Sequence, residues 1–528
     1  MKLTDILAEG FHSQEWTDKG YELPKYDLKA LKEKTYAEPT WVHFGAGNIF
    51  RAFTAAVLHD VLNSGKYDRG IVVAETFDYE IIDKAYAPYE NLSLLVSLQS
   101  TGSIEKKVIG SVTESLKADY GFEKDWARLV SIFRNPSLQM ISFTITEKGY
   151  GVAPQDLERG MTPVLAMGKV AVLLYERFLA GQLPLTIQSM DNCSHNGDKV
   201  KAGVLTYVNK WVADGLVPAE FLAYVQDESK ITFPWAMIDK ITPRPHALVQ
   251  EMLAADGFED NYTIETERHS FTAPFVNAEE TQYLVIEDKF PNGRPPLDKV
   301  GVIFCDRETV NKVERMKVTT CLNPLHTAMS VNGVLLGYTK IADEMKDPEI
   351  VALVKRLGYV EGLPVVTDPG IVSPKAFLDE VIQQRLPNVF MPDDPRRIAT
   401  DTSQKVGIRF GETIKSYLAT GRDLNTLVSV PLALAGWMRY LLGVGDEGQE
   451  IEVSDDPLKE TLQEQLKGIV WNDPASYAGQ LKPILANANI FGLDLTTTPL
   501  AEKIEAIFVE ELAGPGAVRA TLKKYLAE

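Results

Sequence analysis

The chain has 528 residues, of which 45% are hydrophobic and 24% are charged, so we expect a globular protein of two or three domains. Its net charge of −19 repels nucleic-acid phosphates, which argues against a nucleic-acid partner. The acidic N-terminus does not have the pattern of a signal peptide, and no apolar run approaches the roughly 18 residues of a membrane span, so we expect a cytoplasmic protein without a membrane partner.

Three cysteines, Cys193, Cys305 and Cys321, are too few and too widely spaced for a disulfide framework or a structural zinc site. Cys193 and His195 could be metal ligands, but no second pair accompanies them, and we expect no metal. The negative net charge also repels an anionic substrate at long range, so a substrate acid would need a local basic pocket.

An apolar strand at residues 40–44 is followed by a glycine pair and then by apolar residues at helical spacing. This order places a pyrophosphate on a helix N-terminus, because Gly45 permits a tight turn and Gly47 lets the backbone approach the phosphates. Phe50 stands where a third glycine is usual, and a purely structural turn is the alternative. The predicted coenzyme contacts are Gly45, Ala46, Gly47, Asn48, Ile49 and Phe50.

The next strands add two further coenzyme contacts. Residues 71–74 form a second apolar strand that ends in Glu75, with Asp78 just beyond. A carboxylate there can bind the adenosine ribose hydroxyls and disfavours a 2′-phosphate, which favours NAD over NADP, although either acid could simply be solvated. Residues 140–145 form another strand and lead into Thr146, which we expect to face the coenzyme.

The middle of the chain continues the strand pattern and then ends a domain. Residues 185–190 predict a strand that ends in a polar cluster at 191–197, where doubly wound sheets place their chemistry. The prolines and glycine of 291–296 form the strongest loop signal in the chain. We therefore predict a first domain of residues 1–296, with an N-terminal extension at 1–38, and a second domain of residues 297–528.

A lysine, an asparagine and a histidine lie close together in the segment at 316–329. The β-branched residues 318–320 predict extended chain, whereas Asn323 can cap a helix and Pro324 fits its first turn. His326 then lies in that opening turn, near the same side as Asn323. With Lys317 they offer a base, a hydrogen-bond donor and an orienting imidazole; a buried cap, a core histidine and a surface lysine are the alternative.

Seven segments occur in order between about residues 42 and 450: HFGAGNIFRAF, TITEKGY, SMDN-x-x-x-NG, MIDKITP, VIEDKFPNGRP, LN-x-x-H and RIATDTSQK. Together they resemble the polyol-specific long-chain dehydrogenases, the family of mannitol 2-dehydrogenase and of the fructuronate and tagaturonate reductases. The later segments AGWMRY and GVGDEG are similar to the fructuronate reductase branch in particular.

The resemblance implies an α/β chain in which a Rossmann-type dinucleotide-binding domain precedes a mostly α-helical C-terminal domain, with substrate between them. Helical patterns support this independently at 324–338, 348–357, 374–384, 411–420, 424–442, 456–465, 501–512 and 516–526.

The implied activity is metal-independent hydride transfer between NAD(H) and a keto-uronate/aldonate pair, D-fructuronate and D-mannonate. We expect a monomer or a small homo-oligomer. Mannitol 2-dehydrogenase or tagaturonate reductase activity is the close alternative. A non-catalytic NAD-sensing protein is the alternative of a different class, and a zinc dehydrogenase is a weaker one.

The resemblance also assigns roles to residues. In the family a lysine transfers the proton, two asparagines form an oxyanion hole and a histidine orients the substrate. The matching residues are Lys317, Asn192, Asn323 and His326. The matching substrate-binding residues are Ile238, Asp239, Arg397 and Lys405. The last two could bind hydroxyls or a uronate carboxylate, and they supply the positive charge that helps a lysine to lose its proton.

One departure from the family concerns the spacing after Lys317. Five residues, 318–322, separate Lys317 from Asn323, where the family usually has four. On a continuous α-helix the nine steps from Lys317 to His326 would put them on opposite faces, at roughly 100° per residue. We therefore expect the extra residue in non-helical chain or in a bulge. A helix that began before Lys317 would exclude the lysine's role, and the insertion favours the non-catalytic alternative.

Overall fold

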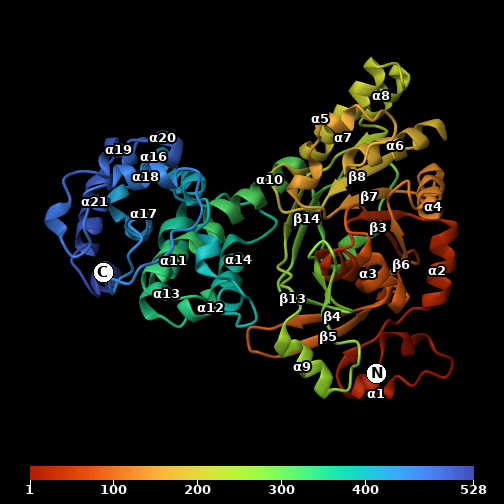
Figure 1. Cartoon of the computed structure of the whole chain (residues 1–528), viewed down its shortest axis with the longest axis horizontal. Coiled ribbons are helices and arrows are strands. Elements are labelled where there is room, and N and C mark those ends of the chain that lie inside the picture. Colours follow the sequence, from red (N-terminus) through yellow and green to blue (C-terminus); the bar gives the residue numbers. More distant parts are fainter. Residues whose placement is uncertain (528) are drawn as a thin grey trace. The chain divides into compact units, whose positions relative to one another are not determined.

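The computed structural model describes residues 1–527, which form two compact units (Figure 1). Unit 1 comprises Met1–Gln99 and Ser103–Asn311, and unit 2 comprises Ser100–Gly102 and the chain from Lys312 on. The change between them falls within helix α10 (Arg307–Met316). The domain boundary after residue 296 stays a prediction.

Unit 1 is built around a six-stranded sheet in which every neighbouring pair is parallel. Counted along the chain, its strands lie in the order 3-2-1-4-5-6, which is the order of dinucleotide-binding folds. The order reverses between β2 and β7, so the crevice for a ligand lies beyond the carboxyl ends of these two strands. The strands are β2 (Trp41–Phe44), β3 (Ile71–Glu75), β6 (Val112–Lys117), β7 (Met140–Phe143), β8 (Leu185–Ser189) and β9 (Ile231–Thr232).

Alternate side chains of these strands pack into two different cores, one on each face of the sheet. Val42 and Phe44 pack with the helices α4 (Glu123–Arg134), α6 (Ala166–Leu179) and α7 (Asn196–Ala213). Trp41 packs on the other face with helix α3 (Ala55–Asn63). Because both faces are covered, β2, β3 and β7 consist mostly of apolar residues, which is why they could be found from the sequence. The other helices of unit 1 are α1 (Gln14–Asp18), α2 (Leu28–Ala37), α5 (Pro154–Leu157), α8 (Ala219–Gln226) and α9 (Ala247–Ala255).

Three smaller sheets complete unit 1. A mixed sheet has the order β1-β5-β4-β13, a second has the order β10-β14-β15, and β11 pairs with β12. Asp239 ends strand β10, which pairs antiparallel with β14. The bounds are β1 (Tyr21–Glu22), β4 (Ser93–Leu98), β5 (Ile104–Ile109), β10 (Ala236–Asp239), β11 (Ile264–Glu265), β12 (Phe271–Thr272), β13 (Phe275–Glu279), β14 (Tyr283–Glu287) and β15 (Ile303–Cys305).

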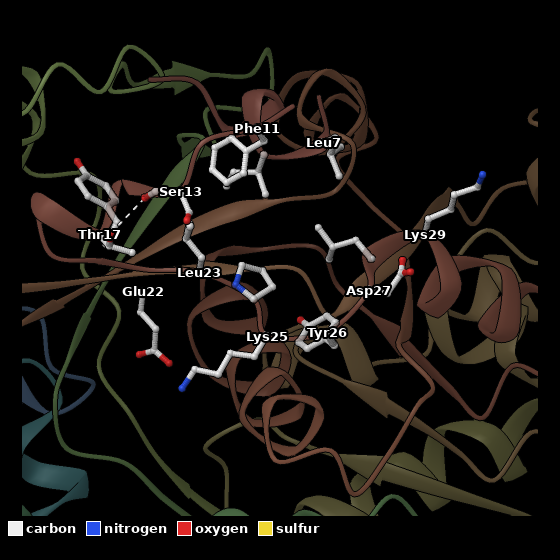
Figure 2. Close-up of a pocket in the computed structure, with 14 residues that line it drawn as sticks. Leu7, Phe11, Ser13, Thr17, Glu22, Leu23, Lys25, Tyr26, Asp27 and Lys29 are labelled. Carbon is white, nitrogen blue, oxygen red and sulfur yellow. Dashed lines mark hydrogen bonds between the residues drawn. The ribbon is translucent and has the colours of Figure 1, made fainter. Parts of the chain in front are cut away.

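The N-terminal extension is bonded into unit 1. Strand β1 pairs with β5, and the Tyr26 hydroxyl lies 2.7 Å from Nδ1 of the buried His59. The extension lines a pocket of about 640 Å³, in which apolar side chains such as Phe11 and Leu23 form part of the wall beside charged ones such as Lys25 (Figure 2). Residues 1–38 are therefore an integral part of this unit.

Unit 2 is helical, and a helix is present at each position predicted after residue 323. Helix α17 is its centre, because every one of its residues is buried and it packs against α11 and α21. The predicted helix at 424–442 is interrupted, since the Glu361 carboxylate accepts the N–H groups of residues 428–430 where α17 begins. The helices are α11 (Asn323–Leu335), α12 (Ile341–Glu344), α13 (Pro348–Lys355), α14 (Pro374–Glu380), α15 (Pro395–Ile398), α16 (Glu412–Ala419), α17 (Ser429–Tyr440), α18 (Lys459–Gln465), α19 (Lys482–Leu485), α20 (Ala488–Phe491), α21 (Leu500–Glu511) and α22 (Ala517–Leu526).

Several turns of π-helix continue the α-helices of unit 2. They are Lys317–Cys321, Arg356–Gly362, Val381–Arg385 and Gly407–Gly411. Across residues 1–527, no helix combines the length and the apolarity needed to span a membrane.

Candidate active site

The glycine pair after β2 has the shape required to receive a pyrophosphate. Gly45 has a φ of 103°, and a Cβ atom built on it would lie 2.3 Å from the Thr144 carbonyl oxygen. Only glycine therefore fits where β2 and β7 diverge. No other atom lies within 4 Å of a Cβ built on Gly47, so an incoming phosphate could approach this backbone. The residues present fit a dinucleotide coenzyme.

Glu75 binds the glycine loop to the end of β3. Its Oε2 accepts the Ala46 N–H at 2.7 Å, and its Oε1 accepts the N–H groups of residues 76–78. Each carboxylate oxygen has about two lone-pair sites. The three N–H groups fill those of Oε1, so at most one site remains for a ribose hydroxyl, on Oε2. The role of Glu75 in ribose binding stays a prediction, and its visible role is to hold the loop. Asp78 is buried and accepts the Thr266 hydroxyl at 2.6 Å.

His43 supports the loop from inside the sheet. Its two ring nitrogens lie 2.6 Å from Ser142 Oγ and 2.8 Å from Thr144 Oγ1, and its ring stacks on Phe50 at 4.4 Å. Complete burial lowers the pKa of His43 to about 3, so the imidazole is neutral at physiological pH. This link connects β2, β7 and the helix start. Asn48 joins the loop to strand β12, because its Nδ2 donates to the Phe271 carbonyl at 3.0 Å.

Asp191 organises the polar cluster after β8. Its carboxylate accepts the N–H groups of Ile145 and Thr146 and the hydroxyl of Tyr150. Burial raises the pKa of Asp191, and these three hydrogen bonds oppose that rise. Thr146 is exposed and has a φ of 65°, an uncommon conformation that the carboxylate holds. Asn192, the next residue along the chain, is exposed.

Asn196 joins this cluster to β10. Its Nδ2 donates to the Ala236 carbonyl at 2.9 Å, and its Oδ1 accepts the Ala236 N–H at 2.9 Å. Two residues further along β10 come Ile238 and Asp239, which are 3% and 4% exposed. Their roles in lining a substrate site stay predictions.

Lys317 lies in the π-helical turn Lys317–Cys321, and its residue is only 3% exposed. The prediction of extended chain at 318–320 was therefore wrong. Helix α10 runs directly into this turn, and Thr319 Oγ1 donates to the Arg315 carbonyl at 2.8 Å. Tertiary packing and this side-chain bond outweigh the weak helix propensity of β-branched residues.

The π-turn accounts for the extra residue after Lys317. A single π-turn inserts one residue into a helix, and such turns are frequent at functional sites. Leu322, with a φ of −131° and a ψ of −61°, then interrupts the helix before α11 begins, so the nine steps from Lys317 to His326 do not follow one α-helix. A helix does begin before Lys317, at Arg307, which is the condition that was expected to exclude the lysine's role. The geometric reason for that exclusion was a continuous α-helix to His326, which the structure does not contain, and the role of Lys317 stays a prediction.

Asn323 and His326 lie in the first turn of α11, and both are partly buried. The predicted helix start at this point is confirmed, with Pro324 in the first turn. The prediction that Asn323 caps the helix was wrong, because Leu322 occupies the cap position and Asn323 is already helical. The Asn323 side chain is therefore not needed as a cap.

The two predicted cationic residues differ in their surroundings. The Arg397 side chain is 70% exposed and pairs with Asp393. Lys405 is partly buried and donates to the carbonyls of Ile398 and Thr400. Burial, and then the neighbouring Arg409 guanidinium, lower the pKa of the Lys405 ammonium.

Arg409 was missed by the sequence analysis. It lies in the π-turn Gly407–Gly411, and its Nη1 donates to Thr327 Oγ1, directly after His326. The signal that could have found it is its position four residues after Lys405, since that spacing puts two cations on one helix face.

Among residues 1–527, no group of three or more His, Cys, Asp or Glu side chains is arranged to hold a metal ion.

Comparison with known proteins identifies both parts of the chain. Residues 39–299 match the mannitol dehydrogenase Rossmann domain, and residues 309–510 match the mannitol dehydrogenase C-terminal domain. The chain belongs to the mannitol dehydrogenase family.

Several members of this family align with almost the whole length of the chain. A D-mannonate oxidoreductase of Thermotoga maritima is 51% identical over 96% of each chain. A D-mannonate oxidoreductase of Escherichia coli is 30% identical over 87% of this chain and 92% of its own. The solved structure of Pseudomonas fluorescens mannitol 2-dehydrogenase in complex with NAD and D-mannitol is 26% identical, with a TM-score of 0.70 over the whole of both chains.

Membership of the mannitol dehydrogenase family makes the protein an NAD-dependent oxidoreductase acting on CH–OH groups. The fold predicted from the sequence, a Rossmann-type domain followed by a helical one, is confirmed. The individual site residues stay predictions.

Proposed function

We propose that this protein interconverts D-fructuronate and D-mannonate, with NADH as the reductant of the keto-uronate. The observation that carries the proposal is the 51% identity to a D-mannonate oxidoreductase over 96% of each chain. The buried, largely satisfied polar groups around the glycine loop support the coenzyme half of the reaction, and the cations at 405 and 409 support an acidic substrate.

In this proposal the bound nicotinamide ring supplies the hydride that reduces the ketone and takes it back in the reverse direction. The ammonium of Lys317 donates a proton to the carbonyl oxygen during reduction, and its amine accepts that proton during oxidation. The carboxamides of Asn192 and Asn323 donate hydrogen bonds to the oxygen as negative charge develops on it. His326 orients the substrate, with Ile238, Asp239, Arg397 and Lys405 as further binding residues.

Mannitol 2-dehydrogenase activity is the second candidate. It is favoured by the likeness to the solved mannitol 2-dehydrogenase, whose structure aligns over the whole chain. A hydroxymethyl group carries no charge, so a neutral substrate does not need the positive charge of residues 405 and 409.

We further propose a cytoplasmic monomer or small homo-oligomer. None of the three cysteines is joined to another by a disulfide within residues 1–527, which suits a reducing compartment. Light scattering behind gel filtration measures the oligomeric state.

The test is NADH oxidation by the purified protein with D-fructuronate, D-tagaturonate and D-fructose, each repeated with NADPH. We expect kcat/KM to be highest for D-fructuronate with NADH. A preference for D-fructose would transfer the assignment to the polyol branch. Binding of NADH without turnover of any of the three would favour the non-catalytic, NAD-sensing alternative.

A further inference from the structure

Arg409 is a largely buried cation that has no anion beside it. Within the described chain, no carboxylate lies at ion-pair distance from its guanidinium, and its one side-chain hydrogen bond goes to Thr327 Oγ1. Burial alone lowers the pKa of Arg409 to about 10, with no acidic neighbour to raise it again. A charge removed from water without a partner is costly for a folded protein, so its retention calls for an explanation.

The position of Arg409 places this charge beside the predicted substrate-binding residues of unit 2. Thr327 follows His326 in the first turns of α11. Lys405 lies one helical turn before Arg409, whose backbone N–H bonds to the Lys405 carbonyl at 2.9 Å. Two cations at this spacing repel each other. Within the described chain no carboxylate lies at ion-pair distance from either of them, although the charges of Asp401 and Asp456 act on Lys405 from farther away.

Backbone packing fixes the turn that carries Arg409. A Cβ atom built on Gly411 would lie 1.9 Å from the Phe491 carbonyl oxygen, and one built on Gly407 would lie 2.7 Å from that of Ile490. The π-turn therefore rests directly on helix α20 at both glycines. The guanidinium is held on a rigid element, and it cannot relax toward an acid elsewhere by a shift of its backbone.

We propose that Arg409 binds the carboxylate of the sugar-acid substrate and is the residue that selects a uronate over a neutral keto-sugar. The inference rests on the proposed function and deepens it. Its Nε and Nη2 atoms make no hydrogen bond in the described chain, so they are available to a ligand. A planar guanidinium can give two parallel N–H bonds to a carboxylate, an arrangement that a single hydroxyl cannot accept. The charge that the fold leaves uncompensated is then neutralised by the substrate.

The experiment measures binding of D-mannonate and of D-mannitol to the enzyme–NADH complex, which cannot turn over, by isothermal titration calorimetry. The variants are Arg409→Met, Arg409→Lys and, as the control, Arg422→Met, which removes an exposed arginine of the same unit. We expect Arg409→Met to weaken D-mannonate binding by roughly 10- to 100-fold, the range of a charged hydrogen bond. The D-mannonate affinity of Arg409→Lys should lie between those of Arg409→Met and the parent, and Arg422→Met should bind D-mannonate as the parent does.

Folding stability distinguishes a substrate-binding arginine from a structural one. Removing an uncompensated charge should leave the ligand-free melting temperature of Arg409→Met unchanged or higher, whereas loss of a structural contact should lower it. The inference is overturned if Arg409→Met binds D-mannonate within twofold of the parent, or if its affinity for NADH or its melting temperature falls together with mannonate binding. Failure of the parent itself to reduce D-fructuronate while it reduces D-fructose would instead refute the proposed function.

Discussion

The polar groups around the coenzyme loop of unit 1 and the cation at Arg409 in unit 2 differ in their partners. In unit 1 the groups around the coenzyme loop have protein partners: Glu75 accepts four N–H groups, Asp191 accepts three donors and His43 meets two hydroxyls. In unit 2, Arg409 has no counter-ion, and neither carboxyl oxygen of the buried Glu344 or Glu511 has a hydrogen-bond partner among the described residues.

This difference indicates how the two units contribute to function. A dinucleotide site is made mainly of backbone groups and a helix start, so its side chains serve to hold the loop. A site for a sugar acid needs cationic side chains that remain available to the ligand. In the proposed mechanism, unit 1 is therefore a preorganised platform for the coenzyme, and unit 2 holds the charge that recognises the substrate.

The largest expected effect concerns the two asparagines, one from each unit. Replacing Asn192 or Asn323 with alanine should lower kcat by roughly 10²- to 10³-fold, the range for removing one oxyanion-hole donor. NADH affinity, measured by quenching of protein fluorescence, should stay at the parental value for both variants. If Asn192→Ala lost NADH affinity with kcat unchanged, unit 1 would contribute the coenzyme site alone.

The next effect concerns the glycine loop. Gly45→Ala forces a side chain into φ 103° and against the Thr144 carbonyl, so unit 1 should lose about 1–3 kcal/mol of stability together with NADH binding. Gly47→Ala is the matched control, because a Cβ there meets no protein atom. It should keep the parental melting temperature and lose only coenzyme affinity. Equal melting temperatures for both variants would contradict the tight approach of β2 to β7.

The smallest effect concerns folding stability, which we expect to depend on pH with opposite sign in the two units. The pKa of His43 is lowered to about 3, so the unfolded chain binds a proton that the folded one does not, and stability falls as the pH drops from 6.5 toward 3. Burial, followed by the charges of Asp347 and Asp394, raises the pKa of Glu344 well above 4.5. The folded chain therefore binds a proton that the unfolded chain loses, and stability falls as the pH rises above 4.5.

Two variants separate these contributions. His43→Asn should flatten the acid side of a stability–pH curve, and Glu344→Gln should flatten the side above pH 4.5. Each should remove up to about 1.4 kcal/mol per pH unit, the slope for a single proton. Calorimetry over a pH series measures both. Parallel curves for the parent and Glu344→Gln would show that the buried carboxyl is not neutral in the folded state.

Much of the fold could be predicted because its signals are local. The apolar strands around Val42, Val72 and Ile141 are buried on both faces, and the helices after residue 323 follow the α-helical period. Strands β4, β5 and β13 of a peripheral sheet were not predicted. Strand β13 pairs with the distant β4, whereas β4 and β5 form a local hairpin whose apolar pattern is interrupted by the charged residues 105–107.

The candidate site could be predicted only in part. The sequence correctly placed a break in the α-helical register after Lys317. It was wrong to predict extended chain there, because residue propensity cannot anticipate a π-turn held by packing and by the Thr319 hydroxyl. The hydrogen bonds of Glu75 depend on where the glycine loop folds, which a sequence does not show. The spacing of Arg409 from Lys405 could be read from the sequence, but the absence of an acid beside it among the described residues could not.

The most direct test of the proposed proton transfer by Lys317 is chemical rescue of a variant that lacks this side chain. Lys317→Ala should reduce D-fructuronate at least 10²-fold more slowly than the parent while binding NADH normally, since it loses only the proton-transfer group. Added methylamine should restore part of that rate, and trimethylamine, which is too bulky for a side-chain cavity, should restore less. A Lys317→Ala protein that keeps more than a tenth of the parental kcat would contradict the account.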